Sequence, residues 1–384
     1  MEYFKRYLFV LFSILVFLFS PFISLFAQDI SQTIHDGVVY REYHFKEIPQ
    51  VIQVVKINRE NLSIKYKVLL GGFDKMGILP LDKMVDQSFS IDEHPIAAIN
   101  ADFYTIQQNP FHADPVGLCI KDGQIISNPV NRSVFTITDK NEYRIDRFEM
   151  TAEITKINGG KFIFKHINCT CPDNSIALIT KGFGLKTRPQ NNSVHILTGG
   201  IQSIIKPDNN YELSIIETLN RDSLLFLADN QIAFVGMGSG AGFLENLKIE
   251  DKLSFSYSVF PEGNNIKHAV GGTPRLLRNG KISIENDLEG VSQSFVDTRH
   301  PRTAIGYNED FLFFVTVDGR QDGYSIGMDL KELASFLIKI GAKEAINLDG
   351  GGSTTMWADG EIRNKPSDGT IRSIANGLAI YVKH

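Results

Sequence analysis

Residues 300–357 read HPRTAIGYNEDFLFFVTVDGRQDGYSIGMDLKELASFLIKIGAKEAINLDGGGSTTMW, and this stretch decides the fold. An apolar run, Phe311 to Val317, ends abruptly in Asp318, which is typical of a buried strand. Apolar residues then recur with helical spacing from Leu330 to Ile338, between an N-cap candidate, Asp329, and a terminating glycine, Gly341. A second short apolar run, Ala345–Leu348, ends in Asp349 and three glycines. The stretch therefore predicts a strand, a helix and a second strand.

This order is typical of a βαβ unit with parallel strands, whose carboxyl ends lie on the same edge of a sheet. Asp318 and Asp349 follow these two ends, and Arg320 lies close to the first. Ligands of open α/β sheets bind at that edge, so we expect a site there. The alternative is that both aspartates only form turns before glycine. The expected fold class is mixed α/β (α+β), with a mixed β-sheet core and flanking helices.

The N-terminus predicts export. Lys5 and Arg6 precede a nearly continuous apolar segment, Tyr7–Phe26, and Ala27 offers a small residue for cleavage. We interpret residues 1–27 as a secretory signal peptide and expect a periplasmic or extracellular protein. An uncleaved membrane anchor is the alternative, since the segment is long enough to span a bilayer. Residues 28–95 alternate in the manner of strands and form a β-rich N-terminal region, and residues 96–384 form the main domain.

Composition excludes some classes of partner. The chain carries 39 basic and 44 acidic side chains, a net charge of −5. This balance gives no reason to expect binding to nucleic acid, or a stable membrane partner once a signal peptide is removed. The chain has three cysteines, Cys119, Cys169 and Cys171. In an exported protein, one disulfide from Cys119 to either of the other two is an option.

Further candidate residues lie outside the organising stretch. The apolar run from Ile96 ends in Asn100-Ala101-Asp102, which adds a third acid at the end of an expected strand. Thr273 follows two glycines, and Arg302 precedes a short apolar strand, where its planar fork suits a phosphate. A surface ion pair is the alternative for Arg302.

One glycine-rich segment imitates a known motif. Residues 236–242 read GMGSGAG after a strand-like run, which fits the dinucleotide-binding pattern. That pattern needs a following helix of several turns to bind pyrophosphate, and only a short helical segment follows here. We therefore expect tight turns rather than a nucleotide site.

Several segments together resemble the phosphodiester glycosidase family. The matching segments, in chain order, are INADFY, GGTPRLLRNGK, RTAIG, VTVDGRQ, SIGMDLKELA, INLDGGGSTTMW and RNKPSDGTIRSIANGLAIYV, and the set spans roughly Ile96 to Val382. The resemblance implies hydrolysis of a sugar-1-phosphodiester, with release of the sugar, and a mixed α/β fold with its site at the sheet rim. Many members have Asn-Gly-Gly where this chain has Asn100-Ala101-Asp102, so the Asp102 carboxylate is extra and is a candidate to alter substrate choice or bind a cation.

The chemistry implied by the resemblance suggests a role for each candidate. Breaking the anomeric C–O bond develops positive charge on the sugar, and a carboxylate can stabilise that charge or activate water. Asp349 or Asp318 is the candidate base or nucleophile, with Asp102 as the third catalytic candidate. The leaving phosphate needs cations and N–H donors. The candidates for binding it and the sugar are Asn100, Thr273, Arg302, Arg320, Gly350, Gly351, Gly352 and Ser353, where the three glycines would form a backbone anion nest.

Two competing classes remain open at this point. The first is a carbohydrate-binding or envelope-structural protein, which needs aromatic platforms; Phe103, Tyr104, Phe111 and Trp357 are the candidates. The second is a phosphodiesterase that attacks phosphorus with the help of metal ions. No His/Asp cluster for two metals is evident, but the three aspartates are candidate ligands for a single divalent cation. No cofactor is otherwise indicated.

Overall fold

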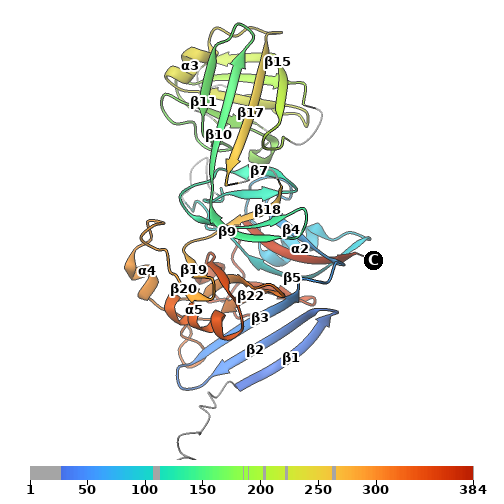
Figure 1. Cartoon of the computed structure of the whole chain (residues 1–384), viewed down its shortest axis with the longest axis vertical. Coiled ribbons are helices and arrows are strands. Elements are labelled where there is room, and N and C mark those ends of the chain that lie inside the picture. Colours follow the sequence, from blue (N-terminus) through green and yellow to red (C-terminus); the bar gives the residue numbers. More distant parts are fainter. Residues whose placement is uncertain are drawn as a thin grey trace, which may run out of the picture.

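The computed structural model describes residues 27–106, 113–184, 186–188, 190–201, 205–220, 224–261 and 265–383. This part of the chain is mostly β-structure arranged in four sheets (Figure 1). Its α-helices have only five to ten residues: α2 (Leu81–Ser88), α3 (Ser239–Leu244), α4 (Gln293–Asp297) and α5 (Leu330–Lys339). The predicted α/β class is therefore wrong in its balance, because strands rather than helices cover most of the sheet faces.

The organising stretch contributes to the first eight-stranded sheet. In spatial order its strands are β1 (Ala27–His35), β2 (Val38–Phe45), β3 (Gln50–Asn58), β22 (Phe311–Val317), β21 (Arg302–Tyr307), β23 (Glu344–Asn347), β19 (Arg275–Arg278) and β20 (Lys281–Ile282). Strand β21 pairs antiparallel with both β22 and β23. The two predicted strands therefore run in the same direction, but they are not neighbours, because β21 lies between them.

Helix α5 connects these two strands and packs on the sheet. Asp329 caps its N-terminus in a capping box with Glu332, and Gly341 adopts a positive φ of 102° after its end. Its apolar face buries Leu333, Ala334 and Leu337 against the sheet, where Val54 is one of the partners. The helix predicted from spacing is thus confirmed at both ends.

A second, five-stranded sheet packs on the other face. Its order is β25 (Glu361–Ile362), β24 (Met356–Ala358), β5 (Glu93–Asn100), β26 (Asn376–Lys383) and β4 (Ile64–Leu70). A shared core joins the two sheets, with Val55 and Phe314 from the first and Ile99 and Leu378 from the second. The strands of residues 28–95 therefore belong to the same sheets as those of the C-terminal third.

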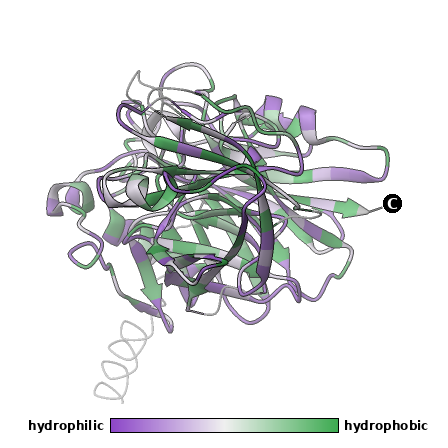
Figure 2. Ribbon diagram, turned by 90° about the horizontal axis from the view of Figure 1, so that it is seen from above, coloured by the Kyte–Doolittle hydropathy of each residue, from purple (hydrophilic) through white to green (hydrophobic). Residues whose placement is uncertain are grey.

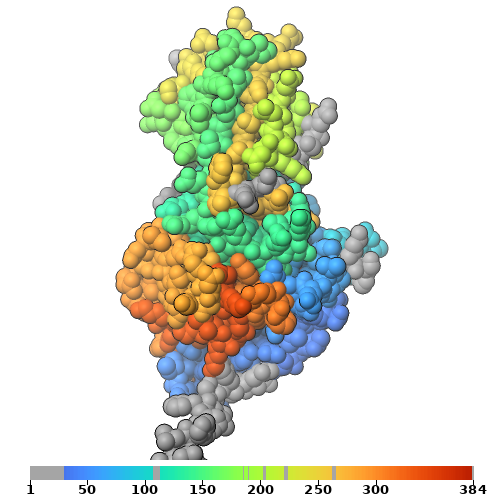
Figure 3. Space-filling view, viewed as in Figure 1, coloured from blue at the N-terminus to red at the C-terminus, as the bar shows by residue number. Residues whose placement is uncertain are grey.

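The remaining sheets extend the molecule in one direction. A third sheet has the order β7 (Gln124–Ser127), β6 (Cys119–Lys121), β18 (Ile266–Gly271), β8 (Ser133–Thr138) and β9 (Tyr143–Arg147). The fourth has the order β11 (Lys161–Phe164), β10 (Glu149–Lys156), β17 (Lys252–Phe260), β15 (Asn210–Asn220), β14 (Val194–Gly199), β16 (Ile232–Gly236), β13 (Ile176–Ile179) and β12 (His166–Ile167). It forms a lobe inserted between β9 and β18 that projects from the body (Figures 1 and 3).

Other expectations meet mixed outcomes. The glycine-rich segment 236–242 leads into α3, which has only six residues and lies in the lobe. All three cysteines are free thiols, so the suggested disulfide is wrong.

The expected signal peptide lies almost entirely outside the described residues. Within the described residues, no helix is long and apolar enough to cross a membrane. Apolar residues concentrate on the strands that form the interior, and polar residues on connecting loops (Figure 2).

Candidate active site

The glycine-rich loop after β23 is anchored to both central sheets. The backbone N–H of Leu348 donates to the Thr303 carbonyl on β21 over 2.8 Å, and that of Asp349 donates to the Ala101 carbonyl, just after β5, over 2.9 Å. A single 3-10 turn, η2 (Gly351–Ser353), follows. The loop therefore closes the junction between the two sheets at the carboxyl end of β23, where the sequence predicts a site.

Asp349 is the carboxylate at the centre of this loop and is partly buried. Burial raises the pKa of its carboxyl to about 6, against the lowering effects of the Ser353 side chain, the Arg372 charge and the Gly350 N–H. A group with such a pKa changes charge close to neutral pH, as a general base or acid must. Among the three predicted catalytic acids, Asp349 best combines access with a shifted pKa.

Two arginines border the glycine loop. The Arg372 guanidinium forms an ion pair with Asp368 over 2.6 Å, and both groups lie so close to Gly352 that a Cβ there would overlap them. The exposed Arg320 guanidinium lies beside Gly351, where an added Cβ would be 3.1 Å from its nitrogens, and it approaches His300 Nδ1 at 3.3 Å. The glycines therefore let two cations reach the loop that carries Asp349.

The predicted backbone nest for an anion is not free in this conformation. Gly351 donates its N–H to the Pro301 carbonyl over 2.9 Å, and the Gly350 N–H serves the Asp349 carboxylate. A Cβ on Gly350 would lie 2.6 Å from the Pro301 carbonyl, so the glycine here permits close backbone packing. The Thr354 hydroxyl is buried without a hydrogen-bond partner in the described part of the chain, whereas the Ser353 side chain acts on the Asp349 carboxyl.

Asn100 is a predicted sugar-binding residue, and in the structure its side chain forms hydrogen bonds with other segments of the protein. Its Nδ2 donates to the Asp349 carbonyl over 2.6 Å, while its Oδ1 accepts from the Thr303 hydroxyl and the Thr355 N–H. Asn100 is buried, at 1% exposure. The amide therefore braces the loop from behind, and the prediction that it contacts substrate is not supported.

The Asp318 side chain also forms its hydrogen bonds within the protein. Its buried carboxylate accepts hydrogen bonds from Gln53 Nε2, the Tyr324 hydroxyl and the Lys365 N–H, each over 3.0 Å. Burial raises the pKa of Asp318, and these donors oppose the rise. The Asp318 carboxylate is therefore engaged in holding its own loop and the segments around it.

Arg302 and Thr273 also use their side-chain donors in hydrogen bonds within the protein. The Arg302 guanidinium donates to the carbonyls of Met328, Phe295 and Thr298, and burial lowers its pKa to about 10. The Thr273 hydroxyl donates to the buried carboxylate of Glu289 over 2.8 Å. Both side chains hold neighbouring segments in place, which argues against the predicted substrate contacts.

Asp102 lies beside the loop but out of solvent, with 1% exposure. Its Oδ2 accepts from the Gly117 N–H over 2.7 Å, and burial raises its pKa to about 7. The nearby charge of Asp349 adds to this rise, which places the two carboxylates in one electrostatic group.

No metal centre is evident in the described part of the chain. The His, Cys, Asp and Glu residues described do not gather in threes around a position that a metal ion could occupy. Asp102, Asp318 and Asp349 therefore do not form such a group in this arrangement, in which the Asp318 carboxylate accepts from Gln53, Tyr324 and Lys365.

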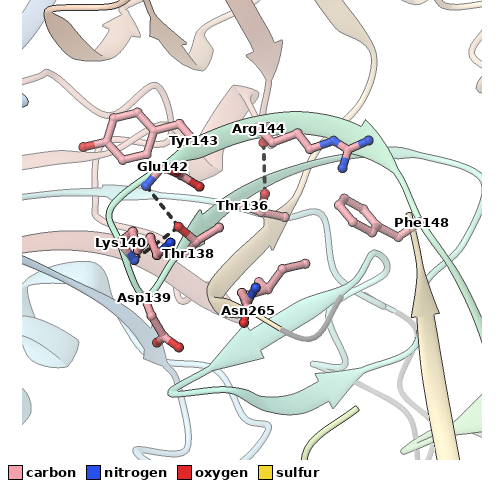
Figure 4. Close-up of a pocket in the computed structure, with 10 residues that line it drawn as sticks. Thr136, Thr138, Asp139, Lys140, Glu142, Tyr143, Arg144, Phe148 and Asn265 are labelled. Atoms are coloured by element: carbon pink, nitrogen blue, oxygen red, sulfur yellow. Dashed lines mark hydrogen bonds between the residues drawn. The ribbon is translucent and has the colours of Figure 1, made fainter. Parts of the chain in front are cut away.

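The aromatic platforms expected of a binding protein are only partly available. Trp357 is 9% exposed and packs in a small core with Leu81 and Tyr381. Phe103 contacts Phe295 edge to face at 6.3 Å, and Phe111 lies outside the described residues. A hollow of about 540 Å³ does open elsewhere, between β8, β9 and Asn265 (Figure 4). None of the predicted site residues lines it.

Comparison with known proteins finds a family match in the C-terminal part of the chain. Residues 226–381, which include the glycine loop and both bordering arginines, match the family model described as phosphodiester glycosidase. Over these residues the chain is similar to the phosphodiester glycosidase family. This confirms the family named from the sequence segments.

Individual relatives are more distant. The chain is 33% identical over 148 residues to N-acetylglucosamine-1-phosphodiester alpha-N-acetylglucosaminidase of Bos taurus, a match that covers 34% of this chain and 28% of that protein. Its fold is similar to a hypothetical protein from Synechocystis, with a TM-score of 0.75 at 20% identity, covering 92% of this chain and 63% of that one. It is also similar to a putative exported protein from Burkholderia pseudomallei, with a TM-score of 0.65 at 18% identity, covering 86% and 74%. The match to the bovine relative thus spans about a quarter of that relative's length.

Two further residues interact with the Asp349 charge, although the sequence pattern predicts no catalytic role for either. Arg372 acts on the Asp349 charge, and Tyr104, whose hydroxyl donates to the Ser373 carbonyl over 3.0 Å, is affected by the same Asp349 charge. Both residues lie within the segments quoted for the family resemblance. Their role was not evident, because neither stands at the end of an expected strand.

Proposed function

We propose that this protein hydrolyses the anomeric C–O bond of a sugar-1-phosphodiester, as an exported enzyme that acts on a sugar phosphate or a related envelope or exopolysaccharide glycan. The observation that carries the proposal is a partly buried carboxylate, Asp349, on a glycine loop flanked by Arg320 and Arg372. Such a site suits a substrate that develops positive charge at carbon and releases an anionic phosphate.

In the proposed reaction Asp349 faces the sugar. Its carboxylate takes a proton from the attacking water, or attacks the anomeric carbon itself before water does. The bond between that carbon and the phosphate oxygen breaks, and the electron pair leaves with the oxygen. A phosphate monoester and a free sugar result. The phosphate is a stable anion, so the reaction depends less on a general acid than on cations at the leaving group.

Arg320 is the proposed phosphate contact. Its guanidinium is exposed and rests on Gly351, and one of its nitrogens approaches the ring of His300. A guanidinium has five N–H donors, so it keeps several of them for an anion. Arg372 is already paired with Asp368 and is proposed to hold the charge of Asp349 in place.

The test uses the purified mature chain with a simple alkyl α-N-acetylglucosamine-1-phosphodiester in oxygen-18 water, with and without EDTA. The phosphate product is analysed by mass spectrometry, because the anomeric hydroxyl of the sugar exchanges with water. Unlabelled phosphate monoester is expected, since attack at carbon leaves the phosphate oxygens intact. Labelled phosphate would mean attack at phosphorus and would overturn the mechanism, and loss of turnover with EDTA would reveal a metal requirement.

A further inference from the structure

Asp102 occupies a compartment that is built for a carboxyl group. It lies just after β5, between Gly117, which precedes β6, and Gly271, at the end of β18. A Cβ on Gly117 would come within 2.9 Å of Asp102 Oδ2, and a Cβ on Gly271 would overlap the same oxygen. Two glycines thus make the space that the carboxyl fills.

Only one of the two carboxyl oxygens of Asp102 has a hydrogen-bond partner in this compartment. Oδ2 accepts the Gly117 N–H over 2.7 Å, whereas Oδ1 is buried and has no hydrogen-bond partner in the described part of the chain. An ionised carboxylate with an unpartnered, buried oxygen is unfavourable, and a protonated carboxyl is far less so. The geometry therefore favours a neutral Asp102.

The surrounding charges oppose one another. The backbone N–H of Asp349 donates to the carbonyl of Ala101, the residue before Asp102, so the two acids sit on hydrogen-bonded backbone. The negative charge of Asp349 disfavours ionisation of Asp102, while the Arg132 guanidinium and the Gly117 and Phe103 N–H groups favour it. Cys119, on β6, is a neutral neighbour, since burial raises the pKa of its thiol to about 12.

We propose that Asp102 and Asp349 hold one proton between them near neutral pH, that Asp102 keeps this proton, and that loss of it weakens the binding of anionic substrates. Asp102 is then a positioning residue that acts on substrate only through its charge. The last part of the inference rests on the proposed function; the sharing of the proton does not.

The order of the two ionisations follows from the two environments. Asp349 is partly exposed and has cationic neighbours, so it ionises first as pH rises, with a pKa of about 6. Asp102, with a pKa of about 7, then loses its proton against the existing charge of Asp349. Between these values the site carries one negative charge, and above them it carries two.

The protonation states of Asp102 and Asp349 are measured first, by a method that does not depend on enzymatic activity. Protein labelled with carboxyl carbon-13 aspartate is titrated by NMR from pH 4 to pH 9, in the wild type, Asp102→Asn and Asp349→Asn. We expect one wild-type aspartate to titrate above pH 6.5, its signal to vanish in Asp102→Asn, and its midpoint to fall in Asp349→Asn. If the highest aspartate midpoint lies near 4, or is unmoved in Asp349→Asn, the proposal is overturned. The wild type and Asp349→Asn are sufficient if Asp102→Asn does not fold.

The consequence for binding is tested with the same diester substrate, whose single charge is constant over this range. The KM of the wild type should rise roughly fivefold or more between pH 6 and pH 8.5, because a second negative charge then repels the substrate. The KM of Asp102→Asn should stay level. A parallel rise in both proteins would overturn the charge effect. Absence of turnover by the wild type would instead contradict the proposed function, and the NMR titration alone would then decide whether the proton is shared.

Discussion

The side-chain amide of Asn100 donates a 2.6 Å hydrogen bond to the backbone carbonyl of Asp349. This bond links the end of β5 in one sheet to the loop that follows β23 in the other. The Asn100 carbonyl oxygen accepts from Thr303 and Thr355 in addition, so the amide joins three segments that are far apart in the chain. The candidate catalytic carboxylate therefore stands on a backbone that both central sheets hold in place.

Asp349→Asn should abolish most turnover and leave the fold intact. The substitution removes a carboxylate that is only partly buried and keeps its shape, while loss of a base or nucleophile costs about 10²–10⁴ in rate. Hydrolysis of the diester and thermal unfolding would be measured together. Asp92→Asn, at an exposed turn before β5, is the matched control and should keep full activity. Full activity of Asp349→Asn would remove Asp349 from the mechanism.

The pH profile of the wild type should lose activity on the acid side near pH 6. The folded-state pKa of Asp349 is raised to about 6, so its carboxylate is ionised above that pH and becomes protonated as the pH falls through it. A carboxylate that acts as base or nucleophile is then lost. The check is kcat/KM between pH 4.5 and pH 7.5, and a flat profile across pH 6 would contradict the assignment.

Gly352→Ala should reduce activity by roughly tenfold or more, since small displacements of catalytic groups have large effects. The added Cβ would overlap the ion pair of Asp368 and Arg372 and push Arg372 away from Asp349. Gly242→Ala is the control, because a Cβ at that position in the lobe meets no atom within 4 Å. Initial rates of the two variants give the comparison, and equal rates would show that the close packing at Gly352 is dispensable.

Arg320→Gln should weaken substrate binding more than it slows the chemical step. The exposed guanidinium at the glycine loop is the proposed contact for the phosphate, and hydrogen bonds to charged groups contribute about 1.5–3 kcal/mol. We expect KM to rise about tenfold, corresponding to about 1.4 kcal/mol. Lys248→Gln, the control, removes the same charge from an exposed position in the lobe. An unchanged KM in Arg320→Gln would place the phosphate elsewhere.

Asp318→Asn should lower stability rather than remove the catalytic group. The carboxylate accepts three hydrogen bonds of 3.0 Å, and an amide nitrogen in its place would face donors. A cost of about 2 kcal/mol in the free energy of unfolding is expected, measured by urea denaturation. Asp322→Asn, at an exposed position in the same loop, should have little effect. If Asp318→Asn keeps its stability and loses all turnover, Asp318 regains its place as a catalytic candidate.

Local features of this fold were evident in the amino-acid sequence. The strand Phe311–Val317 has the limits that its apolar run predicts, and α5 starts and ends at the residues that carry the capping signals. The hairpin between β19 and β20 turns at Asn279-Gly280, a pair typical of such turns, and both residues have positive φ. Each of these depends on neighbouring residues only, so composition and spacing are sufficient to predict it.

The partners of these elements were decided by the tertiary structure. Strand β21 separates β22 from β23. Four candidate site residues form hydrogen bonds within the protein: Asn100, Thr273, Arg302 and Asp318. Arg372 acts on Asp349 from 23 positions further along the chain. The sequence by itself located the ends of strand β22 and helix α5 and named the polar residues that follow strand ends as candidates. Only the packed structure decided which of them remain available, because a buried polar group must find its hydrogen-bond partner wherever the fold brings one.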